Sequence, residues 1–180
     1  LSLTSTYKIR VTTGVEDSAG NNLTSQYGAT NGFATCSGNV GFAVGGRSGL
    51  IFTSTNGTTC WINRTSGTSQ HLDGGVSYLN NLFIALGQFG TILTSSDGVT
   101  WTARTSGTTS NLWAGAYGNS TYVVVGDSGT ILTSSDGISW TTRNSGGDSL
   151  YGAAFGNNVF VAVGLSGTIL SSSDGSSWIS

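Results

Sequence analysis

Residues 90–98 read GTILTSSDG, and residues 129–137 repeat all nine letters. Residues 167–175 read GTILSSSDG, and residues 49–57, GLIFTSTNG, are a divergent copy. A tryptophan follows each copy, and the successive tryptophans are 40, 39 and 38 residues apart: Trp61, Trp101, Trp140 and Trp178. A period of this length indicates a repeat architecture, in which each unit buries its apolar face against the next unit.

One period contains four short strand patterns and no helical periodicity of useful length. Residues 150–155 are small and apolar, as expected of a strand crowded against a central axis. After a Gly-Asn-Asn turn signal, residues 159–163 form a continuous apolar run, which is typical of a strand buried on both faces. The Gly164-x-x-Gly167 turn leads into a third strand, and the outer strand begins at Trp178. The sequence therefore predicts an all-β propeller of about four four-stranded blades of 38–40 residues. The predicted blades are residues 33–70, 71–111, 112–149 and 150–180.

The Ser-x-Asp-Gly-x-x-Trp element of each repeat is interpreted as a structural turn. An Asp side chain at a tight turn accepts hydrogen bonds from backbone N–H groups two residues on, and Gly supplies the positive φ that the turn requires. The Trp can fold back over the hairpin and bury its face between neighbouring blades. Each acid stands alone in the sequence, which favours this role over calcium binding or catalysis. The turn residues are Asn56, Asp97, Asp136 and Asp174, and the tryptophans are Trp61, Trp101, Trp140 and Trp178.

These repeats resemble the Asp-box, or BNR, repeats of sialidases and related β-propellers. The resemblance is closer to propellers of the photosystem II assembly/stability factor type, whose repeats read G-x-x-G-x-I-x-x-S-x-D-G-x-x-W. The usual Asp-box has one more residue between Asp and Gly, and the first repeat has Asn56 for Asp and an inserted residue around Cys60. The resemblance covers residues 33–180 and implies a propeller fold. It does not imply one function, because propellers carry many unrelated activities.

Sialidase activity is excluded by residues that the chain lacks. In that family an arginine triad holds the substrate carboxylate, and a glutamate activates a tyrosine nucleophile. Glu16 is the only Glu here and lies outside the repeats, and the sequence has no Pro for the family's Arg-Ile-Pro motif. Arg64, Arg104 and Arg143 occupy one repeat position, so we expect them on separate outer strands. No G-x-S-x-G elbow accompanies the single histidine, His71. The sequence predicts no catalytic residue, no metal site and no cofactor.

Residues 1–32 do not fit the repeat and form a separate segment. Residues 6–13 alternate like a half-exposed strand, and residues 14–23 are a polar, turn-rich connection. The pattern Tyr-x-Ile-x-Val-Thr-Thr-Gly-Val-x-Asp-x-Ala-Gly-Asn-x-Leu resembles the last strands of bacterial Ig-like domains, which occur in tandem on surface proteins. Because an Ig-like sandwich needs about seven strands, this pair is either a remnant or an extension. As an extension it would complete a blade, cover a sheet edge or pair with a neighbouring chain.

The amino-acid composition limits where in or outside the cell the protein is expected and which partners it is expected to bind. Charged residues make up 8% of the chain, against about 25% in an ordinary soluble domain. A formal net charge of −2 disfavours nucleic-acid binding, and no apolar run reaches the ~18 residues of a membrane span. The chain does not begin with Met, which indicates a processed chain, a fragment or part of something longer. The low charge, the abundant Ser, Thr, Gly and Asn, and the two cysteines favour an extracellular or cell-surface protein.

Cys36 and Cys60 are the candidate disulfide. Two cysteines in a secreted chain usually form one disulfide. Two predicted strands lie between these residues, however, and their sulfurs must come within bonding distance. The sequence leaves open whether they pair.

Positions that vary between repeats are the candidate binding residues, because the constant positions serve the fold. After the blade-opening Leu the chain has Asp73, Trp113 and Tyr151; the Gly-x-x-Gly turn carries Arg47, Gln88, Asp127 and Leu165, with Phe89 beside Gln88. Alternate connections of a four-stranded blade share a side, so both loops are expected on one rim. We expect Trp113 and Tyr151 to be aromatic anchors for a ligand. The alternative is that all of these are ordinary, varied surface positions.

The sequence favours a non-enzymatic extracellular or cell-surface repeat protein, which acts as a structural or adhesive element through protein–protein contacts. Two alternatives stay open: a lectin-like propeller that binds glycans, and an assembly-factor-like propeller with a protein client. A four-bladed ring is tight, and open ends expose unpaired edges and apolar blade faces. Further blades outside this chain, or assembly of several chains into a homo-oligomer or filament, would cover those faces.

Overall fold

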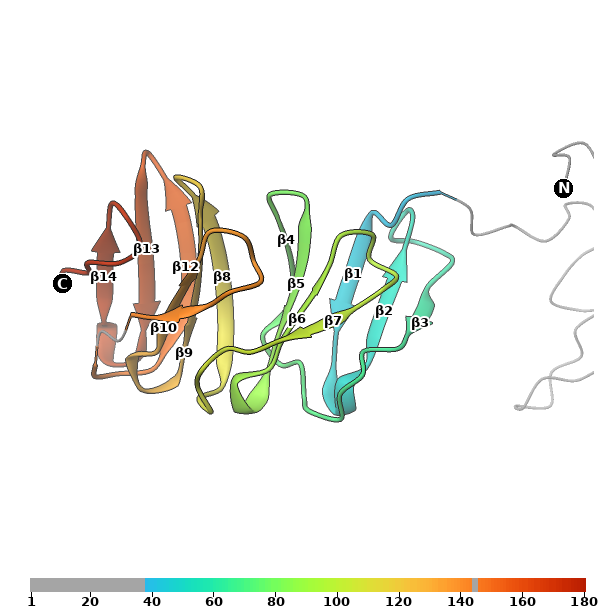
Figure 1. The fold of residues 1–180 in the computed structure, drawn as a ribbon, viewed down its shortest axis with the longest axis horizontal. Helices are drawn as coiled ribbons and strands as arrows, with labels where there is room; N and C mark the ends of the chain where they lie inside the picture. The colour runs from blue at the N-terminus through green and yellow to red at the C-terminus, as the bar shows by residue number, and fades with distance from the viewer. Residues whose placement is uncertain (1–37, 144–145) are drawn as a thin grey trace, which may run out of the picture. The chain divides into compact units, whose positions relative to one another are not determined.

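Four short antiparallel sheets follow one another along the chain in the computed structural model, which describes residues 38–143 and 146–180 (Figure 1). These residues belong to one structural unit, Ser37–Ser180. The predicted Ig-like segment 1–32 and Cys36 lie outside the described residues.

The sheets, which we call blades one to four, contain strands that are neighbours in sequence. Blade one contains β1 (Phe42–Gly45), β2 (Ile51–Ser54) and β3 (Ile62–Arg64). Blade two contains β4 (Gly75–Leu79), β5 (Leu82–Leu86), β6 (Ile92–Ser95) and β7 (Thr102–Arg104). Blade three contains β8 (Leu112–Gly118), β9 (Thr121–Gly126), β10 (Ile131–Ser134) and β11 (Thr141–Thr142). Blade four contains β12 (Leu150–Gly156), β13 (Val159–Gly164) and β14 (Ile169–Ser172). A short 3-10 turn precedes the third strand of each repeat: η1 (Arg47–Gly49), η2 (Gln88–Gly90), η3 (Asp127–Gly129) and η4 (Leu165–Gly167).

The all-β prediction is confirmed as four antiparallel sheets of three or four strands. Blade one shows three strands because its predicted innermost strand falls on residues before 38, outside the described part of the chain. Blade four shows three strands because its outer strand is reduced to a bridge between Ser171 and Ile179. The total number of blades and the closure of a ring stay predictions.

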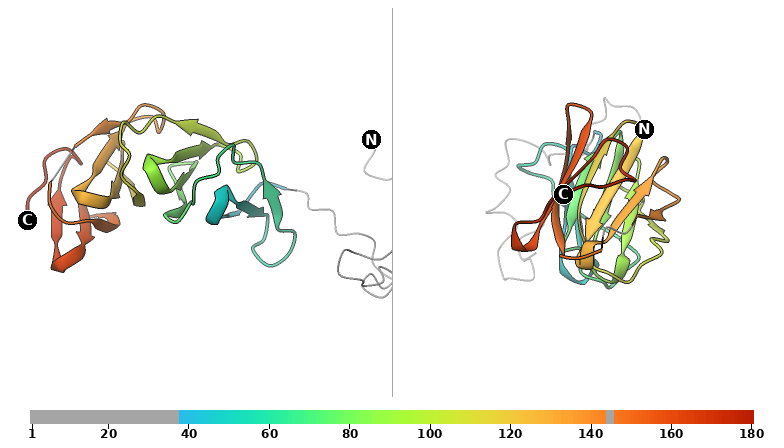
Figure 2. Two further views of the ribbon diagram at one scale, coloured as in Figure 1. Left: turned by 90° about the horizontal axis from the view of Figure 1, so that it is seen from below. Right: turned by 90° about the vertical axis from the view of Figure 1, so that its left-hand side faces the viewer.

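The blades stack face to face, and the innermost strands of blades two, three and four contact one another in sequence. β4 contacts both β1 and β8, and β8 also contacts β12. Within residues 38–180, Figure 2 shows the four sheets following one another along an arc.

Three apolar clusters lie between consecutive blades. Ile51 of blade one packs with Ala85 and Leu93 of blade two. Ile84, Leu86 and Ile92 of blade two pack with Tyr122, Val124 and Leu132 of blade three. Val123, Val125 and Ile131 of blade three pack with Phe160 and Ala162 of blade four. Alternate residues of a strand point to opposite sides of the sheet, so each blade has a forward face toward the next blade and a backward face toward the previous one.

In blades two to four, the glycine of the Ser-x-Asp-Gly turn makes room for a side chain of the preceding blade. A Cβ added to Gly98 would lie 2.6 Å from Cγ1 of Val40, and one added to Gly175 would lie 2.9 Å from Cγ2 of Val123. A Cβ on Gly137 would collide with the side chain of Leu82. We call Gly57, Gly98, Gly137 and Gly175 the interblade notches. Gly98, Gly137 and Gly175 let consecutive blades approach closely at the ends of the sheets, and Gly57 is the equivalent glycine of blade one.

A second set of glycines brings two backbone segments together inside a blade. A Cβ on Gly87 would collide with the carbonyl oxygen of His71, on the segment that enters the same blade. The next residue, Gln88, donates its N–H to that carbonyl at 2.9 Å. Gly126 and Gly164 stand in the same relation to Asn111 and Ser149. Because Gly87 has an extended φ of −164°, glycine is required here for space.

We therefore expect Gly87→Ala to lower the free energy of unfolding by about 1–3 kcal/mol, since the backbone must move to accept the added methyl group. Gly156→Ala is the matched control, because a Cβ at Gly156 meets nothing within 4 Å; its effect should stay within about 0.5 kcal/mol. Urea unfolding followed by tryptophan fluorescence measures both. Equal effects of the two substitutions would show that the contact at Gly87 is not tight.

Candidate functional site

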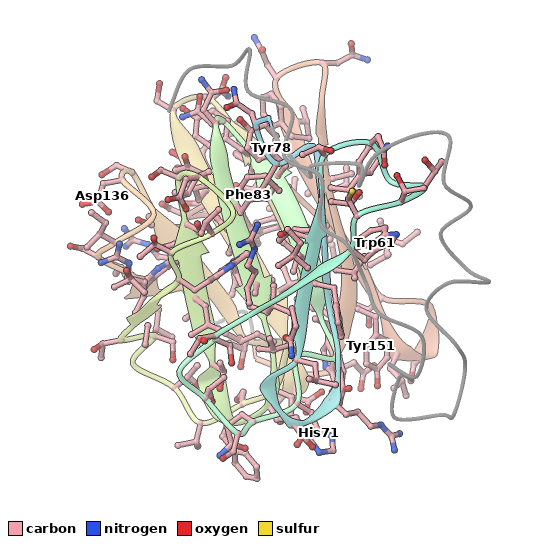
Figure 3. The ribbon with its side chains drawn as sticks, turned by 90° about the vertical axis from the view of Figure 1, so that its right-hand side faces the viewer. Trp61, His71, Tyr78, Phe83, Asp136 and Tyr151 are labelled. Atoms are coloured by element: carbon pink, nitrogen blue, oxygen red, sulfur yellow. The ribbon has the colours of Figure 1, made fainter. Side chains whose placement is uncertain are left out.

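The connections of each blade alternate between its two ends, as they must in an antiparallel meander. One end holds η1–η4 and the segments that enter the blades, residues 71–74, 111–113 and 149–151; we call it the turn rim. The opposite end, the hairpin rim, holds the Ser-x-Asp-Gly turns and the β4–β5, β8–β9 and β12–β13 hairpins. Figure 3 shows His71 and Tyr151 at the end opposite Tyr78.

On the turn rim, Asp127 of η3 fixes an aromatic side chain. The indole Nε1–H of Trp113 donates to Oδ1 of Asp127 at 2.6 Å. The Trp113 ring meets the Tyr151 ring of blade four edge to face, with the centroids 6.0 Å apart. Three of the predicted binding residues, from blades three and four, are thus brought together by one carboxylate and one ring contact.

A neighbouring group on the same rim belongs to blade two. The side-chain amide of Gln88 donates to Oδ2 of Asp73 at 3.0 Å. Nδ1 of His71 lies 3.9 Å from the same oxygen. The two variable loops therefore contact each other within blade two, as they do within blade three through Trp113 and Asp127.

Asn111 connects the two groups. Its amide Nδ2 donates to Oδ2 of Asp127 at 2.9 Å, and its Oδ1 accepts the backbone N–H of Phe89 at 3.1 Å. A continuous series of contacts thus runs from Phe89 through Asn111, Asp127 and Trp113 to Tyr151. The sequence did not identify Asn111 as a candidate. Asparagine is common in turn-rich repeats, and the sequence does not show which residues its side chain contacts.

Phe89 is an exposed aromatic residue in a strained backbone position. Its φ is +53° and the residue is 64% exposed. At the equivalent positions of the other turns the chain has Ser48, Ser128 and Ser166, all with positive φ. A bulky residue in the left-handed region is uncommon, and such strain often accompanies a functional role. The sequence signal for Phe89 was present, since a large apolar residue replaces serine in one repeat only.

An open groove of about 780 Å³ begins beside Phe89. Its lining continues over residues 90–93 and 103–109, and the blade-connecting residues Gly67 and Thr68 form another wall. Arg104 lies in this lining and donates from Nε to the hydroxyl of Thr94 at 2.7 Å. The groove is in the size range of ligand sites, roughly 300–1,000 Å³.

Two predicted rim residues remain outside this network. Arg47 is exposed on η1, and no carboxylate pairs with it among the described residues. Leu165 occupies the Asp127 position in blade four and offers no acceptor to Tyr151. Arg64, Arg104 and Arg143 lie on or beside separate outer strands, each donating from Nε to a threonine of the neighbouring strand, and do not converge.

The Ser-x-Asp-Gly turns have the hydrogen bonds that their sequence predicts. Oδ1 of Asp97 accepts the N–H groups of Val99 and Thr100, both at 2.8 Å, and the hydroxyl of Ser95 at 2.8 Å. Asp136 and Asp174 repeat this arrangement. In blade one the Asn56 Oδ1 accepts the two N–H groups at 3.0 Å. Each aspartate is therefore used within its own turn.

These donors lower the pKa values of the turn aspartates. The N–H of Thr100, followed by that of Val99 and the Ser95 hydroxyl, lowers the pKa of Asp97 to about 2. The N–H of Ser139 is the largest cause for Asp136, whose pKa also falls to about 2. The pKa of Asp174 is lowered in the same direction, chiefly by the N–H of Ser177.

Three of the four repeat tryptophans lie at the interfaces between blades, as predicted. Trp101, Trp140 and Trp178 pack against the three apolar clusters. Trp61 is 40% exposed, because no blade stands before blade one within the described residues. Cys60 is disulfide-bonded, whereas Cys36 lies outside the described residues, so their mutual pairing stays a prediction.

Within residues 38–143 and 146–180, no three His, Cys, Asp or Glu side chains come together as a metal site would require. In the same ranges, no helix has the length and apolar character needed to cross a membrane.

Comparison with known proteins identifies the fold. No protein-family model and no curated protein matches the sequence. The chain resembles the structure of "YCF48 bound to D1 peptide" with a TM-score of 0.58 and 18% identity, over 76% of this chain and 50% of that one. It resembles the computationally designed Ika4 protein with a TM-score of 0.58 and 16% identity, over 76% and 86%. An ancestral GH74 enzyme matches with a TM-score of 0.52 and 16% identity, over 80% and 24%.

The fold is propeller-like. At these identities the similarity concerns the fold alone, and the chain spans half the length of the YCF48 chain that it matches.

Acid should destabilise the blades through the turn aspartates. Their folded pKa values lie below the unfolded value of about 3.9, so their contribution is present above pH ~4 and is lost as the pH falls toward ~2. The triple variant Asp97→Asn, Asp136→Asn, Asp174→Asn should lose less stability than the wild type as the pH falls. It should keep the fold, since Asn56 makes the same turn. Urea midpoints at pH 7 and about pH 2 test this. Asp148→Asn, at an acid that accepts one hydroxyl from Thr168, should retain the wild-type acid sensitivity.

Proposed function

We propose that this chain is a non-enzymatic protein-binding module, and that its turn rim holds an extended segment of a partner protein. The observation that carries the proposal is the series of contacts from Phe89 to Tyr151. It fixes the backbone of Phe89 and the side chain of Trp113, which contacts Tyr151, so that aromatic residues of three blades lie on one rim. Aromatic anchors of this kind dominate the energy of protein interfaces. Because the contacts exist before binding, little side-chain entropy is lost when a partner docks.

The chemistry of the rim indicates what such a segment contains. The exposed Phe89 ring suits an apolar side chain, and the adjoining groove, lined mainly by Gly, Thr and Ser, offers polar contacts to the rest of the segment. Asp73 and Asp127 supply negative charge on either side of Asn111, and their hydrogen bonds come from neutral amide or indole donors. A partner segment with an apolar anchor and a basic residue therefore fits this rim best, and its binding should weaken with added salt.

The structural neighbours agree with this proposal without deciding it. One of them is YCF48 bound to D1 peptide, a protein of similar fold that holds a peptide. This supports the assembly-factor-like alternative more than adhesion. The proposal includes an extracellular or cell-surface location, for which the low charge of the chain is the support. A glycan is the competing ligand, because exposed aromatic rings also stack on sugars.

Phe89→Ser is the most informative test of the rim. The other three turns carry serine with the same sign of φ, so the variant should keep or slightly raise the thermal midpoint. Linear peptides selected by display against the full chain should lose affinity for Phe89→Ser by on the order of 10-fold or more, the effect of removing an aromatic anchor. Fluorescence anisotropy with a labelled selected peptide measures the affinity.

Val99→Ser is the matched control, since Val99 is an exposed apolar residue on the hairpin rim; peptide binding should be unchanged. The pair Trp113→Ala, Tyr151→Ala should weaken binding as Phe89→Ser does. Peptides that bind all the rim variants as tightly as the wild type would rule out the rim as the site. Glycan-array binding that depends on the same rim residues, with no peptide binding, would replace the proposal by the lectin alternative.

A further inference from the structure

Both ends of the blade series carry exposed apolar faces. On the forward face of blade four, Val163 and Ile169 are 44% and 60% exposed. On the backward face of blade one, Phe42, Val44 and Phe52 are exposed. Scattered apolar residues are ordinary on a protein surface, but these are grouped on the two outermost sheet faces.

Equivalent residues inside the series show what covers such faces. Val163 and Ile169 correspond to Leu86 and Ile92 in blade two and to Val125 and Ile131 in blade three; all four are buried against the following blade. Phe42 corresponds to Phe83, Tyr122 and Phe160, which are buried on backward faces. The same forward-to-backward interface therefore occurs three times within the chain. Within residues 38–143 and 146–180, no other sheet covers the forward face of blade four or the backward face of blade one.

In blades two to four, the interblade notches also pair each blade with the blade before it. Gly98, Gly137 and Gly175 each face a side chain of the preceding blade, whereas a Cβ added to Gly57 of blade one would lie 3.1 Å from the Phe42 ring of its own blade. In blade four, Val159 occupies the position of Leu82, which enters the notch at Gly137. Val159 is exposed. Blade four thus presents the inserting side chain, and blade one presents the equivalent glycine, against which the Phe42 ring of the same blade packs.

We propose that the forward face of blade four binds the backward face of blade one in a second copy of this chain. Val163 and Ile169 would pack against Val44 and Phe52 of the second copy, and Val159 would enter its notch at Gly57. The argument for a second copy as the occupant is continuity: the internal interfaces pair the equivalent forward and backward faces three times. Such a contact is head-to-tail, and it closes into a ring or continues as an open chain according to its rotation.

The test uses the full chain and two charge variants on opposite faces, Ile169→Lys and Val44→Lys. Sedimentation velocity of the wild type should show mass above the 18.3 kDa of one chain, increasing with concentration. Each lysine would be buried without a partner at the contact, so each variant alone should associate on the order of 100-fold more weakly. Ile138→Lys is the control, because Ile138 is comparably exposed but lies on the hairpin rim; it should associate like the wild type.

Mixing the two variants separates head-to-tail association from other modes. The Ile169→Lys chain keeps an intact blade one, and the Val44→Lys chain keeps an intact blade four. An equimolar mixture should therefore form dimers that neither variant forms alone. A wild type that stays monomeric at every concentration would overturn the proposal. So would variants that keep the wild-type mass, or a mixture in which no dimer forms. Circular dichroism of each variant establishes that the fold is retained.

Discussion

Each blade is a thin sheet with apolar side chains on both faces, and neither face is buried unless another sheet covers it. This constraint determines most of the structure. Ile84, Leu86 and Ile92 are buried only because blade three stands against blade two. Close approach of the sheets requires glycine at Gly98 and Gly137, where a side chain of the preceding blade occupies the space of a Cβ. The outer tryptophans complete the same interfaces. Stability is therefore shared between neighbouring blades, as in other repeat proteins.

Much of this architecture can be predicted from the sequence, because its signals are local and repeated. The nine-residue repeat establishes the period, and strand alternation together with the Asp-Gly turns locates the strands. The turn at Asp97 forms from residues within five positions of one another, so its hydrogen bonds can be inferred without the fold. The division into forward and backward faces is harder to predict. In a continuous apolar run such as 159–163 the alternation is masked, and only the packed structure shows which residues meet which blade.

The sequence predicted which residues lie on the turn rim but not which of them contact one another. Variation between repeats identified Asp73, Trp113, Tyr151, Gln88 and Asp127 as the residues to consider. Their pairing depends on contacts between side chains 14 to 16 positions apart, as in Trp113 with Asp127 and Asn111 with Asp127. Such pairs follow from the register of the strands and not from composition. The positive φ of Phe89 is likewise a property of the folded turn, although its replacement of serine is visible in the sequence.

The two proposed surfaces use different parts of a blade, and this separation has a consequence. Faces of sheets join blades, whereas the turn rim lies at the ends of the strands and stays accessible when the faces are covered. Association through blades four and one would set η4 of one copy beside η1 of the next, so that the turn rim continues from chain to chain. A partner with several suitable segments would then meet several rims at once, and its overall affinity would exceed that of a single site without any new contact. The repeat that builds the interior would in this way also multiply the binding surface.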